Sequence, residues 1–296
     1  MEHQSLAEYL ESLHKLSSAK SYHFSIVKFL TTNPEAEQYG YQDIVNYLLE
    51  LKKQKLSDTY RSKVLASIKK YYDYLIYIEV RKYHPCRRLH IKDGRKKGLN
   101  FEELFTADEL ELLLTREERY RYLGHRNKFL ISLLIYQGLA SSELVKLTVQ
   151  DIDLDDATIN IKASRQLSGR ILPMHRTQVM LASLYLEDSR EFLIKKGKPT
   201  NKLFITKLGA SETVDGIHAM LEPLKGLFPH KTLNPKTVRM SVIANWLNER
   251  KLPLEDVQLM AGHKWPSSTE RYKRANLEEQ RRLINQFHPL SNLNKK

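Results

Sequence analysis

The chain has 296 residues, of which 41% are hydrophobic and 28% are charged. This composition is typical of a folded, water-soluble protein with one large domain or two ordinary ones, and it excludes an intrinsically disordered chain. The formal net charge of +13 favours a polyanionic partner, most often a nucleic acid, although such a charge also serves solubility alone.

Several classes of protein are disfavoured at this stage. No run of about 18 apolar residues is present, so we expect no membrane-spanning segment. The first residues, MEHQSLAEYLESLH, are acidic and amphipathic, unlike a signal or transit peptide. The single cysteine, Cys86, excludes an internal disulfide framework and fits a reducing compartment. We therefore expect a cytoplasmic protein.

Residues 1–83 repeat apolar positions at helical spacing with few breakers. Leu6, Leu10 and Leu13 fall on one face of the first helix, and we predict that Ser57 is the N-cap of the last one. Four or five such helices in about eighty residues predict a small helical bundle, which we assign as a first domain.

Residues 84–103 differ in kind, because they combine a proline, two glycines and many cations with little periodicity. The charge is uneven on a larger scale as well: residues 1–50 hold three Lys and Arg against seven Asp and Glu, whereas residues 51–100 hold fifteen against four. We interpret 84–103 as a basic linker. Phosphate contact and a solvated loop are both consistent with its cations.

Residues 104–296 are predicted to form a second, mostly helical domain with a small sheet. Thr106 and Glu109 form a capping box, and an apolar helix ends near Gly138. The segments ATINIKA and GRILPM then alternate as strands do, and they flank a polar turn. The fold class is therefore mainly α with a small β-hairpin.

Five short elements follow one another along the second domain. They are GLASSEL at 138–144, the hairpin at 158–173, KTVR at 236–239, AGH at 261–263, and Tyr272. Their order and spacing resemble the tyrosine recombinases, also called phage-type integrases. The resemblance covers nearly the whole chain and is strongest from residue 236 to residue 274.

The resemblance implies a SAM-like helical core-binding domain and an α/β catalytic domain that clamp double-stranded DNA. In this family a tyrosine hydroxyl attacks a DNA phosphate and forms a 3′-phosphotyrosyl link, without a metal or other cofactor. The family works as a homotetramer assembled on two duplexes, in some cases with accessory DNA-bending proteins. The attack places extra negative charge on the nonbridging oxygens, which cations must stabilise, and the leaving 5′-oxygen needs a proton donor.

The family's site residues fall in three short sequence motifs, called boxes. By this resemblance, Tyr272 is the nucleophile, nine positions after His263, which matches the histidine of the third box. Arg239 matches the second-box arginine, whose planar fork suits two phosphate oxygens. Lys236 stands where the family usually has histidine, and it still donates a hydrogen bond. Glu143 matches the acidic residue of the first box, which supports the site and does not react.

Two positions depart from the family pattern. Ala140 occupies the place of the first-box arginine, so one phosphate-clamping cation is missing. The position of the general-acid lysine, five residues before Arg170, holds Arg165, and arginine is a poor proton donor. Lys162 is the second candidate for that role. Arg126, Arg165 or Arg170 is a possible replacement for the missing cation.

We interpret the chain as a site-specific DNA recombinase or integrase with an altered active site. One alternative is a degenerate recombinase fold that acts as a sequence-specific DNA-binding accessory factor, which Ala140 and Arg165 favour. A basic, RNA-associated helical protein with chance matches is a second alternative. The segment NLEEQRRLINQFHPL, which starts at residue 276, is expected to pack on a neighbouring protomer or on its own domain.

Overall fold

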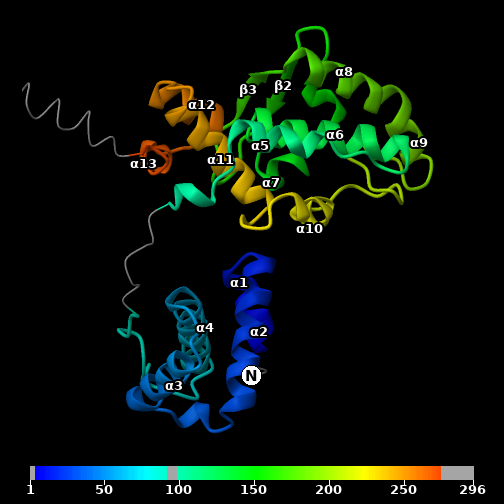
Figure 1. The fold of residues 1–296 in the computed structure, drawn as a ribbon. Helices are drawn as coiled ribbons and strands as arrows, with labels where there is room; N and C mark the ends of the chain where they lie inside the picture. The colour runs from blue at the N-terminus through cyan, green and yellow to red at the C-terminus, as the bar shows by residue number, and fades with distance from the viewer. Residues whose placement is uncertain (1–3, 92–98, 275–296) are drawn as a thin grey trace, which may run out of the picture. The chain divides into compact units, whose positions relative to one another are not determined.

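The computed structural model describes residues 4–91 and 99–274, which divide into two compact units, Met1–Lys97 and Gly98–Lys296. Each unit has its own hydrophobic core. Figure 1 shows the helices and strands of each unit.

The first unit is a bundle of four α-helices, as predicted from its apolar spacing. They are α1 (Leu6–Leu13), α2 (Leu16–Thr32), α3 (Tyr41–Lys53) and α4 (Asp58–Tyr77). Ser57 caps α4, because its side chain accepts a hydrogen bond from the Tyr60 N–H at 3.2 Å. The core is made of residues from all four helices, with Leu10, Ile26 and Ile44 fully buried. The prediction of a helical first domain is confirmed.

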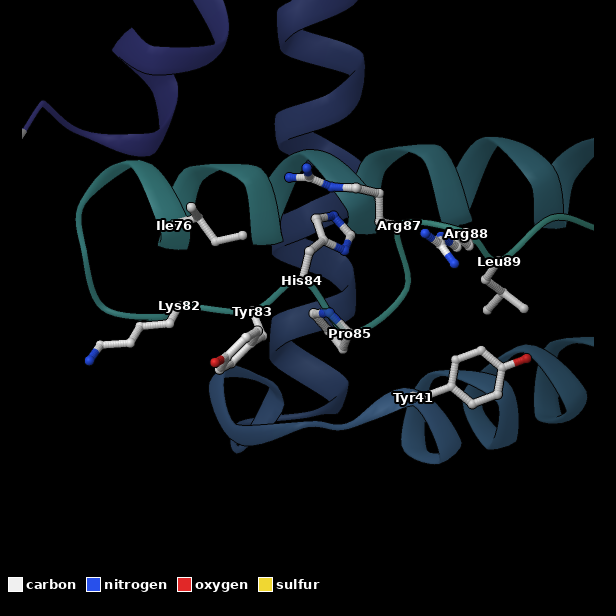
Figure 2. Close-up of a pocket in the computed structure, with 9 residues that line it drawn as sticks. All are labelled: Tyr41, Ile76, Lys82, Tyr83, His84, Pro85, Arg87, Arg88 and Leu89. Atoms are coloured by element: carbon white, nitrogen blue, oxygen red, sulfur yellow. The ribbon is translucent and has the colours of Figure 1, made fainter.

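The segment after α4 packs onto this bundle. Cys86 is 1% exposed, and Leu89 and Ile91 lie against the same core. His84 holds the segment to α4 through a 3.1 Å hydrogen bond between its Nε2 and the Lys69 carbonyl oxygen. Figure 2 shows the segment passing between α4 and the start of α3, where it lines a pocket of about 630 Å³ with Tyr41.

The domain limits therefore differ from the sequence interpretation. We predicted a bundle over 1–83, a basic linker over 84–103 and a catalytic domain over 104–296. The described residues 84–91 belong to the first unit, because Cys86, Leu89 and Ile91 are apolar and bury against it. At the other end, a 3₁₀ turn at Phe101–Glu103 already belongs to the second unit.

The second unit is mostly helical. Its α-helices are α5 (Ala107–Glu111), α6 (Arg121–Tyr136), α7 (Ser141–Leu144), α8 (Arg176–Leu184), α9 (Glu191–Ile194), α10 (Val214–Leu221), α11 (Pro235–Asn248), α12 (Leu254–Ala261) and α13 (Pro266–Glu270). The capping box of Thr106 and Glu109 is formed at the start of α5. The apolar helix is α6, and it is followed by Gly138 in the left-handed region at φ 59°. A π-helical turn, Tyr185–Arg190, joins α8 to α9.

The predicted hairpin is present as two strands of a three-stranded antiparallel sheet. The strands are β1 (Ile152–Asp153), β2 (Thr158–Ile161) and β3 (Arg170–Pro173), in the order β1-β2-β3. The register pairs Ile161 with Arg170, so the connecting loop spans residues 162–169. Helix α12 lies against both β3 and α11, which brings three separate segments of the chain together (Figure 1).

Within residues 4–91 and 99–274, no helix is long and apolar enough to cross a membrane. The C-terminal stretch from residue 276, which we expected to pack on a neighbouring protomer or on its own domain, lies outside the described residues.

Candidate active site

A buried carboxylate lies at the centre of the site. Glu143, on α7, receives two hydrogen bonds from Arg170 at the start of β3, with Nη1–Oε1 at 2.6 Å and Nη2–Oε2 at 3.2 Å. The side chains of Glu143 and Arg170 are 3% and 1% exposed. The Ala140 backbone N–H also donates to Glu143 Oε2, at 2.9 Å. This capping interaction fixes the carboxylate at the N-terminus of α7.

A second guanidinium reaches the same carboxylate from α11. Arg239 Nη1 lies 3.4 Å from Glu143 Oε2 and donates to the Gly138 carbonyl at 2.6 Å, while Nη2 donates to the Ala261 carbonyl at 2.5 Å. Burial lowers the pKa of Arg239, and the Glu143 carboxylate opposes that shift. Among the described residues, Arg239 Nε has no hydrogen-bond partner in the protein, so this donor is available to a ligand.

The turn after α12 joins the hairpin loop to the site. Gly262 has a left-handed φ of 67°, and its carbonyl accepts a hydrogen bond from the Ser168 N–H at 2.9 Å. Leu167 forms a β-bridge with His263. A Cβ atom at residue 262 would overlap the Arg170 guanidinium. Glycine is therefore required here both by the backbone conformation and by the approach of Arg170.

His263 faces this cationic cluster as a neutral base. Its Nδ1 is 2.8 Å from Thr269 Oγ1. Burial, followed by the charges of Arg239, Arg170 and Arg271, lowers the pKa of His263 to about 4. The imidazole is therefore uncharged near neutral pH, and Nε2 is the ring atom left for a substrate.

Tyr272 follows α13 and is 9% exposed. Its ring stacks on His263, with ring centroids 6.1 Å apart and planes inclined by 15°. The structure thus brings Tyr272, His263 and Arg239 together, as the sequence predicted. Tyr272 is also among the groups whose charge acts on Arg239.

The other predicted site residues lie at the edge of the cluster. Lys236 is exposed on the first turn of α11, one turn before Arg239. Lys162 is 67% exposed and pairs with the buried Asp151, with Nζ–Oδ1 at 3.1 Å. Arg165 is exposed in the hairpin loop, and its carbonyl accepts a 3.0 Å hydrogen bond from Lys264 Nζ.

Of the three arginines considered as replacements for the missing first-box cation, the structure places Arg170 in the cluster. Arg126 belongs elsewhere: it is buried, it pairs with Glu212, and its Nη1 donates to Asn127 at 2.7 Å. Arg126 is therefore removed from the candidates, because its charge is already neutralised in a separate part of the core.

In the sequence, Arg170 served mainly to locate Arg165, which lies five residues before it. The contact between Arg170 and Glu143 was not predicted. Asn248 was missed entirely, although this side chain hydrogen-bonds the Tyr272 backbone. Neither pairing has a sequence signal, because each joins residues on separate elements. No group of three potential metal ligands occurs in the described part of the chain.

The fold is that of solved recombinases and integrases. A XerH site-specific recombinase bound to difH in a pre-cleavage complex superposes with a TM-score of 0.69 at 19% identity, over 90% of this chain and 79% of that one. The Tn1549 transposon integrase with circular intermediate DNA gives a TM-score of 0.66 at 17% identity, over 95% and 99%.

The family profile described as the phage integrase family matches residues 103–279, and this chain belongs to that family. The chain is similar to the tyrosine recombinase XerD of Oceanobacillus iheyensis, with 31% identity over 252 residues, 83% of this chain and 82% of the relative. It is also similar to the tyrosine recombinase XerC of Bacillus subtilis, with 27% identity over 257 residues, 86% and 82% of the two chains.

Proposed function

We propose that this chain is a site-specific DNA recombinase that cuts and rejoins DNA through a 3′-phosphotyrosyl intermediate on Tyr272. The observation that carries the proposal is the stacking of Tyr272 on His263 beside Arg239, within a single chain. Family membership supports the same reaction. The chemistry is nucleophilic catalysis, in which the covalent link conserves the energy of the phosphodiester bond.

Arg239 is the cation that binds the scissile phosphate. Its Nη1 and Nη2 atoms are held by backbone carbonyls of Gly138 and Ala261, so its orientation is set before DNA arrives. Glu143, Arg170 and Arg239 together carry one net positive charge. A preorganised positive charge stabilises the extra negative charge of the transition state, because little reorganisation is needed during the reaction.

Arg170 compensates for Ala140 in part. Most of its donors are used by Glu143, the Met260 carbonyl at 2.7 Å and the Ser168 carbonyl at 3.4 Å. It therefore acts by charge and by neutralising Glu143, which frees Arg239 for the phosphate. The site therefore keeps a net positive charge although residue 140 is alanine.

His263 donates one hydrogen bond to the phosphate through its Nε2–H. Because its pKa lies at about 4, it does so as a neutral imidazole at pH 7. Lys162 and Arg165 are the candidates to protonate the leaving 5′-oxygen. We favour Lys162, since a lysine ammonium gives up a proton more easily than a guanidinium does. Lys236 adds a further donor on the open side of Arg239.

The substrate is double-stranded DNA, in keeping with the net charge of +13. In the first unit, Lys82 and Arg88 line the pocket of Figure 2 together with Arg87, and they are suited to contact the phosphate backbone. We further propose a homotetramer that assembles on two duplexes in the cytoplasm, where accessory DNA-bending proteins could assist. The assembly follows the family's habit.

The polarity of the covalent link provides the test. Purified protein is incubated with fragmented DNA from the source organism and denatured in detergent, and the covalently retained DNA is recovered. A 3′-phosphotyrosyl link leaves the 5′ ends open, so the retained strands should be digested by a 5′-to-3′ exonuclease and resist a 3′-to-5′ exonuclease. The opposite sensitivity, or no retained DNA, would overturn the proposal and favour a DNA-binding accessory role.

A further inference from the structure

One side chain holds the backbone that directly follows the Tyr272 side chain. Asn248, the last residue of α11, donates from Nδ2 to the Tyr272 carbonyl at 2.8 Å, and its Oδ1 accepts from the Arg274 N–H at 2.8 Å. Nδ2 also donates to the Ala244 carbonyl at 2.7 Å. The carboxamide therefore uses its donors and its acceptor at the same time.

The element that carries Asn248 also carries Arg239, nine residues earlier on the same helix. An α-helix of that length is about 14 Å long and behaves as a rigid rod. Because Asn248 lies at the end of this helix and hydrogen-bonds the Tyr272 backbone, it fixes the position of Tyr272 relative to the Arg239 guanidinium. In the described part of the chain, no other side chain of α11 forms a hydrogen bond to residues 271–274.

The remaining attachments of Tyr272 are weaker or local. Its N–H donates to the Thr269 carbonyl at 3.0 Å within its own turn, and its ring stacks on His263. Beyond it, the Arg274 guanidinium lies over the Phe101 ring, 5.0 Å from the ring centroid. Asn248 is therefore the side chain that ties this short segment to a long helix through directed hydrogen bonds.

We propose that Asn248 is a positioning residue for the nucleophile: it holds Tyr272 in attacking position within the site of its own chain. The inference rests on the proposed role of Tyr272. Its physical basis is that attack on phosphorus requires near-contact and alignment, and a displacement of about 1 Å costs on the order of 100-fold in rate. Asn248 does not contact the phosphate in this scheme.

Two variants and three controls test this role. Asn248→Ala removes all three hydrogen bonds, whereas Asn248→Asp keeps the acceptor for the Arg274 N–H and loses the donors. Asn245→Ala is the matched control, because Asn245 lies one turn earlier on α11 and donates to the Phe105 carbonyl at 3.2 Å, away from Tyr272. Wild type and Tyr272→Phe complete the set.

The measurement is the rate of adduct formation with excess full-length protein on fragmented source DNA, together with DNA retention before denaturation. We expect Asn248→Ala to form the adduct about 10- to 100-fold more slowly, with unchanged DNA retention and a thermal midpoint close to that of Asn245→Ala. Asn248→Asp should fall between Asn248→Ala and wild type. Amide hydrogen exchange at Arg274 should accelerate in Asn248→Ala and not in Asn245→Ala.

Equal adduct rates for Asn248→Ala and Asn245→Ala would overturn the positioning role, as would unchanged exchange at Arg274. If wild type itself forms no adduct, the proposed nucleophile fails and the inference fails with it. These failures are distinguishable, because the first leaves a wild-type adduct that Tyr272→Phe abolishes.

Discussion

Arg170 and Glu143 form a two-point ion pair between the first residue of β3 and the single turn α7, with Nη1–Oε1 at 2.6 Å and Nη2–Oε2 at 3.2 Å. The same carboxylate accepts from the Ala140 N–H and lies 3.4 Å from Arg239 Nη1. One buried anion thus links the hairpin, the first box and α11. The site depends on this link, because breaking one partner leaves an uncompensated buried charge.

Arg239→Ala should reduce the rate of DNA cleavage by about 100- to 1000-fold, the range seen when one preorganised donor to a developing oxyanion is removed. Arg239→Lys should restore little, because lysine cannot contact Gly138, Ala261 and phosphate from one planar fork. The check is single-turnover adduct formation, with the exposed Arg119→Ala as control. Equal rates for the two alanine variants would exclude Arg239 from the reaction.

Ala140→Arg restores the cation that the family has at this position. If its guanidinium reaches the phosphate, cleavage should accelerate by about 10-fold, because one further charge stabilises the transition state. Ser142→Arg adds the same charge at an exposed position two residues along and should change the rate little. A slower Ala140→Arg variant, with its thermal midpoint intact, would show that Arg170 and Glu143 have closed the space that the arginine needs.

Gly262→Ala should destabilise the second unit by about 1–3 kcal/mol, since alanine is strained at positive φ and its methyl group would displace the Arg170 guanidinium. The displaced arginine should also slow cleavage. Thermal unfolding of the variant is compared with that of Gly226→Ala, because a Cβ at residue 226 meets no atom within 4 Å. Matching midpoints for both variants would contradict the tight approach of Arg170.

His263 makes stability depend on pH in a defined window. Its pKa falls from 6.5 to about 4 on folding, mainly through burial and then through Arg239 and Arg170. Between these values the unfolded chain binds more protons, so the free energy of unfolding should fall as the pH decreases from 6.5 to 4. Well above pH 6.5, where both states bind no proton at this residue, it contributes no slope. In urea titrations at several pH values, His263→Gln should show a shallower loss, whereas identical slopes would refute the burial of a neutral imidazole.

Much of the fold was predictable because the capping residues and the spacing of apolar residues favour the same helices and strands that the tertiary structure contains. The Ser57 cap, the Thr106–Glu109 capping box and the glycine after α6 are each specified by neighbouring residues. The hairpin strands were likewise readable from their alternation. The first strand of the sheet, Ile152–Asp153, was missed because two residues carry no periodic signal.

The candidate site was predictable only where the chain resembles the tyrosine recombinases. Tyr272, His263 and Arg239 were assigned through that resemblance, and they do lie together. The partners of single cations were not predictable, because any of many carboxylates could be the partner. Arg126 pairs with Glu212, 86 residues away, and Lys162 pairs with Asp151. The predicted C-terminal limit of the first unit was too early for a related reason. Cys86 lies among cations in the sequence, and its burial depends on a core built from distant helices.

The central claim is that Tyr272 attacks DNA, and removal of its hydroxyl group tests this most directly. Wild type and Tyr272→Phe are incubated with fragmented source DNA, and binding is measured before denaturation in detergent and covalent retention after it. We predict equal DNA binding by both proteins, with covalently retained DNA only for wild type. Retention by Tyr272→Phe at the wild-type level would contradict the account, as would a wild type that binds DNA and retains none.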